Sequence, residues 1–269
     1  MVGWAYDPTL FTSSDRVAIH RGTDMDIWKY YHITHSQHLV CNPLLPEKFE
    51  RICHLLAPGG RVLDMACGKG ELLIRLAELY QISGVGVDIS PFSIDECLEK
   101  QRRRAPTADL RFLLMDGATY RPDAPFDIAL CLGASFVYGG YARTLDALKG
   151  MVVPGGLLVT GEPFWIREPE QEYLQARPIN REDYASGFGG NITIGEGKGL
   201  HCIYALESSN DDWDHYIALQ WKAVQDYAKA QPGDQDLAEL LERNGREKKY
   251  YLHWERSVLG WGVYIFRMP

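Results

Sequence analysis

Short apolar runs alternate with amphipathic segments between residues 46 and 161. From Pro46 to Leu56 the apolar side chains recur every three or four residues, a spacing that places them on one face of a helix. The apolar runs predict strands at 61–66, 84–88, 110–115, 126–132 and 156–161, and the segments between them predict helices at 70–82, 91–104 and 141–151. Nearly continuous apolar strands that alternate with helices indicate a parallel sheet covered on both faces.

The last hundred residues break this alternation. Residues 162–200 are polar and rich in glycine, with no clear period. After them the pattern predicts a strand, two helices and a final strand, at 200–206, 211–230, 235–254 and 261–268. We therefore predict a Rossmann-like, doubly wound α/β fold with a mostly parallel sheet of seven strands and a helical insertion before the last strand.

The same pattern suggests how the chain is divided. Residues 46–269 are predicted to form one domain, because no linker or repeat interrupts them. Within it, the segments 162–200 and 211–254 are expected to act as caps. Residues 1–45 carry no clear period, although 28–40 has a helical pattern, and we expect them to form an N-terminal extension or lid.

Composition narrows the possible partners. The formal net charge of -8 opposes binding to a polyanion, since nucleic-acid binding requires a basic surface. The one basic cluster, Lys100 to Arg104, ends a predicted helix, where cations offset the helix dipole. No apolar run approaches the roughly 20 residues of a membrane helix, and the first residues lack a secretory pattern. The six cysteines form no C-x-x-C pair, so a cytoplasmic protein with reduced thiols is expected.

Candidate chemistry gathers where three predicted strands end. The run Val62-Leu-Asp-Met-Ala-Cys-Gly-Lys-Gly70 leads from a strand through a glycine turn into a helix, which allows the backbone to approach a ligand closely. Asp88 ends the next strand, about 20 residues after the turn. This is the spacing of an acid that accepts hydrogen bonds from the ribose hydroxyls of a cofactor. Asp116 follows the third strand. Because ligands bind outside the carboxyl ends of parallel strands, these positions predict one crevice.

Over residues 46–161 the chain resembles class I S-adenosylmethionine-dependent methyltransferases. Asp64, Gly68 and Gly70 match the family's first motif, with Ala66 where many members have glycine. The resemblance implies S-adenosylmethionine as cofactor: the turn faces its methionine part, Asp88 its ribose, Asp116 with its neighbours the adenine, and Leu132 and the residues after it the amino group. The implied cofactor-binding residues are Asp64, Ala66, Cys67, Gly68, Gly70, Asp88, Ile89, Asp116, Gly117, Ala118, Leu132 and Gly133.

Most of the chain also resembles a functionally unassigned bacterial subgroup of these enzymes. The shared features are His38 with Asn42-Pro43, Gly161-Glu-Pro-Phe-Trp165, Trp213-Asp-x-Tyr216 and Gly260-Trp-Gly262. This resemblance implies methyl transfer but brings no substrate with it. A protein that binds the cofactor without methyl transfer, or that uses it for another reaction, stays open as the alternative.

Two other enzyme classes fit less well. A nicotinamide dehydrogenase would carry a third glycine where this chain has Leu73. A base-modifying DNA methyltransferase would resemble a family with an acid or amide, Pro-Pro and an aromatic after the fourth strand, where this chain has Leu132-Gly-Ala-Ser135. The acceptor is therefore expected to be a small molecule, with its methylated atom and the oligomeric state left open.

Methyl transfer needs alignment of the acceptor and exclusion of water, and it needs a general base only if the acceptor loses a proton. Glu162, at the end of the fifth strand, is the first candidate base, followed by His38 and Asp214. An equal interpretation gives Glu162 an orienting role. His32, His35 and His38 share a helical spacing, but without a cysteine or acid in register we expect no metal site. The aromatic residues predicted to line the acceptor pocket are Trp165, Trp213, Tyr216 and Trp261.

Overall fold

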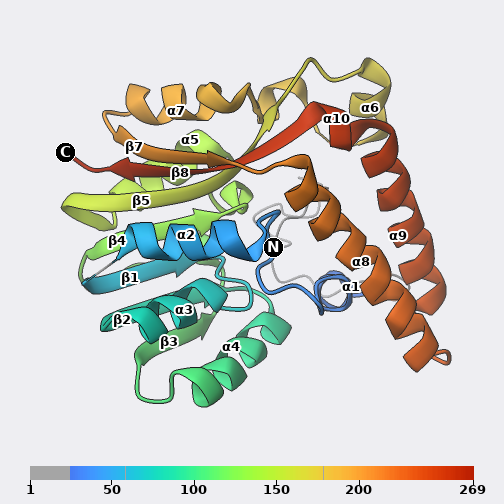
Figure 1. Cartoon of the computed structure of the whole chain (residues 1–269), viewed down its shortest axis with the longest axis horizontal. Coiled ribbons are helices and arrows are strands. Elements are labelled where there is room, and N and C mark those ends of the chain that lie inside the picture. The colour runs from blue at the N-terminus through green and yellow to red at the C-terminus, as the bar shows by residue number, and fades with distance from the viewer. Residues whose placement is uncertain (1–24, 58, 178) are drawn as a thin grey trace.

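A twisted sheet with the strand order β3-β2-β1-β4-β5-β8-β7 forms the centre of the molecule (Figure 1). The computed structural model describes residues 25–57, 59–177 and 179–269. The strands are β1 (Gly60–Met65), β2 (Ile82–Asp88), β3 (Asp109–Leu114), β4 (Phe126–Leu132), β5 (Val152–Trp165), β6 (Ala185–Ser186), β7 (His201–Glu207) and β8 (Leu259–Arg267). This confirms the predicted seven-stranded sheet, to which the two-residue β6 adds a short parallel pairing with β5.

The first five strands run parallel, and β8 lies antiparallel between β5 and β7. Helices cover both faces, as the apolar strands predict. They are α1 (Ile27–Thr34), α2 (Pro46–Leu56), α3 (Glu71–Leu79), α4 (Pro91–Arg104), α5 (Tyr141–Lys149), α6 (Gln171–Ala176), α7 (Phe188–Gly197), α8 (Asn210–Ala230), α9 (Leu237–Tyr250) and α10 (Arg256–Val258). A π-helical turn, Tyr251–Glu255, joins α9 to α10.

Two large apolar clusters lie on the two sides of the sheet. Side chains of α2, α3 and α8 belong to one cluster and those of α5 to the other. The predicted insertion before the last strand consists of the two helices α8 and α9, which lie beside the sheet in Figure 1. A third cluster joins Tyr30 and Ile33 of α1 to Val224 of α8 and Leu240 of α9. The described part of the N-terminal extension therefore packs on the insertion.

Local sequence accounts for the helix starts. The Ser90 side chain accepts a hydrogen bond from the Ser93 amide, and Pro91 occupies the first turn of α4. Ser209 and Asp212 form a capping box that begins α8. Helix α1 is shorter than the predicted 28–40, because the chain leaves the helix at the cap residue His35.

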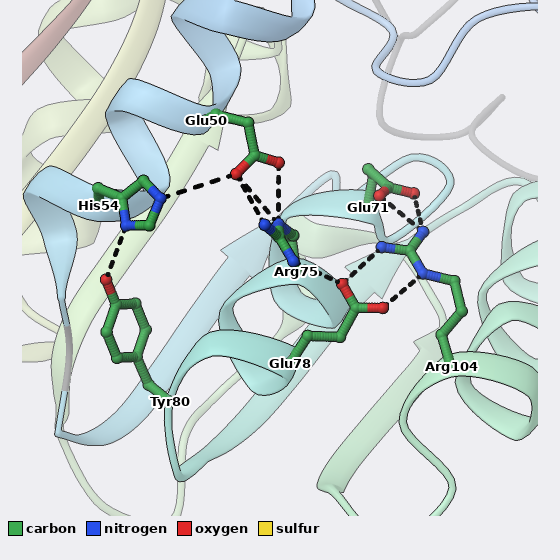
Figure 2. Close-up of polar contacts among 7 residues, drawn as sticks. All are labelled: Glu50, His54, Glu71, Arg75, Glu78, Tyr80 and Arg104. Atoms are coloured by element: carbon green, nitrogen blue, oxygen red, sulfur yellow. Dashed lines mark hydrogen bonds and ion pairs between the residues drawn. The ribbon is translucent and has the colours of Figure 1, made fainter.

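A network of ion pairs fastens the helix that follows the glycine turn (Figure 2). Arg104, in the last turn of α4, contacts both carboxylate oxygens of the buried Glu71 at 2.7 and 2.9 Å and those of Glu78 at 2.7 and 2.8 Å. Arg75 links Glu78 to Glu50 of α2. The basic end of α4 therefore holds α3 in place as well as offsetting a helix dipole.

We expect Arg104→Met to lower the free energy of unfolding by about 2 kcal/mol, because it leaves the Glu71 carboxylate buried with fewer charged donors. Arg103→Met is the matched control. Its pair with Glu99 is largely exposed, and such pairs contribute about 0.5 kcal/mol or less. Urea unfolding of both variants measures the difference, and equal losses would contradict a structural role for the network.

Candidate functional site

The glycine turn between β1 and α3 has the backbone of a ligand cradle. Ala66, Gly68 and Gly70 have φ values of 55°, 51° and 68°, all left-handed. Gly70 has a further reason to be glycine, since a Cβ there would lie 2.7 Å from the Cys97 sulfur. Ala66 adopts the left-handed backbone that alanine resists, so the departure from glycine changes the residue without changing the turn.

Two buried carboxylates flank this turn. Asp88 accepts hydrogen bonds from the backbone amides of Gly68 at 2.9 Å and Ser90 at 2.8 Å, which ties the turn to the end of β2. Among the described residues none donates a hydrogen bond to the Asp64 carboxylate. Burial, together with the nearby Asp88, raises the pKa of Asp64 to about 7. A buried carboxylate with no donor among the described residues suits a cationic partner.

The remaining predicted cofactor residues lie at the same edge of the sheet. Asp116 caps the short helix that Gly117 begins and accepts a hydrogen bond from the Ala118 amide at 2.9 Å. The Met115 amide bonds to the Asp88 carbonyl, which joins this turn to the end of β2 and the neighbouring Ile89. At the end of β4 are Leu132 and Gly133; Gly133 has φ 71°. Cys67 and Ala66 line a small pocket with Asp64 and Leu132.

A segment of the N-terminal extension covers the turn. The Lys69 ammonium lies 3.4 and 3.5 Å from the Ser36 and His38 carbonyls, and Asn42 donates to the Leu132 carbonyl at 3.3 Å. Residues 39–42 and the turn enclose a pocket of about 40 Å³. The segment after α1 is thus placed where a lid over the crevice would be, and its movement stays a prediction.

The structure separates the other two candidate bases from Glu162. His38 contacts the Tyr216 carbonyl through Nε2 at 2.7 Å, and burial lowers its pKa to about 4. Asp214 is partly exposed and accepts hydrogen bonds from Arg256 at 2.8 Å and Tyr251 at 2.6 Å, which lower its pKa. Neither residue lines the large cavity that contains Glu162. These contacts give both residues a structural role at α8, and their part in proton transfer stays a prediction.

The four predicted acceptor-binding aromatic residues are core residues. Trp165, Trp213, Tyr216 and Trp261 belong to the apolar cluster on the α2 and α3 side of the sheet and are at most 5% exposed. None of the four lines the large cavity. Large aromatic side chains stabilise a fold by burial, which gives all four a packing role, and their contact with an acceptor stays a prediction.

The large cavity opens beside the end of β4. Its volume is about 500 Å³, within the range of small-molecule sites. Its walls come from the end of β4, α5, the end of β5, β6 and α7. Its lining residues include Gly133, Ser135, Phe136, Arg143, Glu162, Ile179, Glu182, Asp183, Tyr184, Asn191 and Ile194. Gly133 belongs both to this lining and to the predicted cofactor edge, so the cavity and the crevice are adjacent.

Glu162 is the buried acid of this cavity. It is 3% exposed, and its Oε1 accepts a hydrogen bond from the Ser135 hydroxyl at 2.9 Å. Burial raises its pKa to about 8, against the lowering effect of the serine. A carboxyl group with a pKa near neutrality at a cavity wall can take up and release a proton under physiological conditions.

Sequence reasoning missed the polar partners on the cavity wall, Ser135, Tyr184 and Asn191. Asn191 is 1% exposed and donates to the Pro163 carbonyl at 3.0 Å. For Asn191 the available signal was an amide in the mostly apolar and glycine-rich stretch 188–195, a composition that does not indicate a helix.

Residues 25–57, 59–177 and 179–269 contain no group of three or more His, Cys, Asp or Glu side chains arranged to hold a metal. His35 bonds to the Tyr216 hydroxyl at 2.8 Å. No helix in these ranges is long and apolar enough to cross a membrane.

Known proteins resemble this chain in the part that carries the predicted cofactor site. A family model described as a methyltransferase domain matches residues 62–156. The uncharacterized protein YjhP of Escherichia coli is 28% identical over 243 residues, which cover 89% of this chain and 98% of that protein.

Two solved structures agree with nearly the whole fold. Both are S-adenosylmethionine-dependent methyltransferases in complex with S-adenosyl-L-homocysteine. The protein from Thiobacillus denitrificans is 29% identical, with a TM-score of 0.82 over 92% of this chain and 100% of its own. The protein from Geobacter sulfurreducens is 28% identical, with a TM-score of 0.82 over 91% of this chain and 99% of its own.

Proposed function

We propose that this chain, a class I S-adenosylmethionine-dependent methyltransferase, transfers the methyl group to a small organic molecule held in the cavity beside Glu162. The observation that carries the proposal is the position of a buried carboxyl group on the wall of a 500 Å³ cavity that begins at the cofactor edge. A cavity of this size admits a small molecule and leaves no room for a folded partner.

The residues at the crevice fit the cofactor. When bound, S-adenosylmethionine would supply a methyl group attached to a positively charged sulfur, and that sulfur becomes a neutral thioether once the methyl group is transferred. The left-handed turn at Ala66, Gly68 and Gly70 offers a close backbone approach. Asp64, with a carboxylate that no described residue bonds to, suits the cationic methionine end, and Asp88 suits the ribose hydroxyls.

Asp88→Ala is expected to weaken the binding of S-adenosylhomocysteine by about 1.5 to 3 kcal/mol, the cost of losing hydrogen bonds to a charged group. Part of this loss comes from releasing the Gly68 amide. Calorimetric titration measures it, and Asp95→Ala, an exposed acid on α4, is the control. Unchanged affinity in Asp88→Ala would remove the residue from the ribose role.

Glu162 acts on the acceptor in this proposal. Its carboxylate accepts the proton that an acceptor loses before or during attack on the methyl carbon, and Ser135 holds it in position. An acceptor that fills the cavity displaces water from the wall that carries Glu162. The net charge of -8 favours small or cationic molecules over nucleic acid, and six free thiols suit a reducing compartment such as the cytoplasm.

A cavity-filling variant tests the proposal. We expect Ile194→Trp, on the α7 wall, to abolish transfer of an isotopically labelled methyl group to a panel of small amines, alcohols, thiols and carboxylic acids. The affinity for S-adenosylhomocysteine should not change. The control Thr193→Trp lies on the exposed side of the same helix and should keep full activity. Label found only on macromolecules, or equal activity in both variants, would contradict the proposal.

A further inference from the structure

From the unused hydrogen-bonding groups of the cavity we infer that the acceptor is an amine with an apolar skeleton. Its N–H groups donate hydrogen bonds to Glu162 and Asn191. This inference rests on the proposed function and names the substrate class of the same cavity. It follows from which atoms of each side chain are already occupied.

Glu162 needs a donor. The Ser135 hydroxyl is the one described donor to its carboxyl group, whereas an ionised carboxylate has room for about four hydrogen bonds. The side chain is almost fully buried, so water is a poor substitute. A cationic donor in the cavity would compensate the free-energy cost of ionising the buried Glu162 side chain. A neutral hydroxyl donor would compensate less of that cost.

Asn191 presents an acceptor to the same cavity. Its Nδ2 donates to the Pro163 carbonyl at 3.0 Å and to the Tyr264 hydroxyl at 3.3 Å. A carbonyl only accepts, so this contact fixes which end of the amide is the nitrogen and uses its hydrogens. No residue in the described ranges donates to the amide oxygen of this almost fully buried residue. Two acceptors from two different elements therefore face one cavity.

The charge of the lining agrees with a cation. Besides Glu162, the acids Glu182 and Asp183 line the cavity, and Arg143 is the single lysine or arginine among its described lining residues. Such an excess of carboxylates raises the local concentration of cations. Phe136, on the wall near Gly133, and Ile194, on α7, supply apolar surface for the rest of the molecule.

The proton and electron movements balance for an amine. The ammonium nitrogen gives one proton to the Glu162 carboxylate and gains a lone pair. That pair forms the new nitrogen–carbon bond as the carbon–sulfur bond breaks and its electrons stay on sulfur. The product is a methylated ammonium ion, and the proton on Glu162 leaves to solvent after release.

Calorimetry on the complex with S-adenosylhomocysteine tests this inference, with benzylamine and its near-isosteric neutral analogue benzyl alcohol as probes. We expect benzylamine to bind at least about 10-fold more tightly, the scale of one charge-assisted hydrogen bond. At pH 7 free Glu162 is mostly protonated, because its pKa is about 8. Binding of the ammonium ion should therefore release about one proton, fewer as the pH rises through 8, and benzyl alcohol should release none.

Two variants separate this result from unspecific binding. Glu162→Gln should abolish proton release and the preference for the amine, and Asn191→Leu should lower the affinity for benzylamine several-fold. The affinity for S-adenosylhomocysteine reports whether each variant is folded. Equal binding of the two probes, amine binding without proton release, or no amine binding at about 10 mM would overturn the amine inference. Methyl transfer to alcohols or thiols alone would also overturn it, while leaving the proposed function intact.

Discussion

Glu162→Gln is expected to slow methyl transfer by about 100- to 10 000-fold, the range for loss of a positioned general base. Glutamine keeps the shape of the side chain and a hydrogen bond to Ser135, but it cannot take a proton. The affinity for S-adenosylhomocysteine should stay within about twofold, because Glu162 lines the acceptor cavity. An effect confined to turnover shows that the residue acts in the transition state. Steady-state kinetics with a labelled cofactor and calorimetry on the same preparation measure both quantities.

The pH dependence provides the control for this prediction. The base form of Glu162 is the carboxylate, so kcat/KM should rise with pH and level off above about 8, the pKa that burial gives this group. Ser135→Ala removes a hydrogen bond that lowers this pKa, and the rising limb should move to higher pH. Glu162→Gln should lose the limb. A variant with turnover within about threefold of the original would show that Glu162 only orients its neighbours.

The fold could be predicted because its buried parallel strands leave a continuous apolar pattern. Strands β1, β2 and β4 lie within two residues of their predicted bounds. The fifth strand was expected at 156–161 and spans Val152–Trp165. Its start was hidden by Pro154 and by Gly155, which has φ 80°, and its end by Pro163, which forms a strand residue opposite Trp261. Proline and glycine usually mark strand ends. Here β8 holds Pro163 in the sheet, and the Gly155 amide bonds to the carbonyl of Met268, just after β8.

The stretch 162–200 could not be assigned for a different reason. Helix α7 contains four glycines in ten residues, a composition that disfavours helices. Gly195 is required by packing, because a Cβ there would lie 2.3 Å from the Phe266 ring. The contact between α7 and β8 stabilises a helix that local propensity opposes. Such a contact is invisible until both segments are placed.

In the candidate site, the cofactor residues could be predicted from the sequence and the cavity walls could not. Asp64, Asp88 and Asp116 gather at one edge because strand order alone brings the carboxyl ends of parallel strands together. The cavity walls come from segments far apart in the sequence, such as Ser135 and Asn191, so no spacing indicates them. The aromatic residues at 165, 213, 216 and 261 were chosen for their position after the cofactor half, and position along the chain does not distinguish a core from a pocket wall.

The segment after α6 depends on one buried ion pair. Arg177 contacts Glu255 of the π-helical turn through Nε at 2.9 Å and Glu247 of α9 at 2.8 Å, and its guanidinium stacks over the Tyr250 ring. Arg177 and Glu255 are 4% and 5% exposed. The Tyr173 hydroxyl also donates to Glu255, at 3.1 Å. The pair thus connects the segment ahead of the cavity wall to the helical insertion.

Arg177→Met should lower the free energy of unfolding by about 3 to 5 kcal/mol at pH 8, because it leaves the Glu255 carboxylate buried without its cation. Burial already raises the pKa of Glu255, and losing Arg177 raises it further. A carboxyl group whose folded-state pKa is raised binds protons more tightly in the folded protein, so the loss should be smaller at pH 5 than at pH 8. Urea unfolding at both pH values measures this. Arg177→Met with Glu255→Leu removes both charges and should recover most of the loss; a double variant as unstable as the single one would show that the arginine acts through packing alone.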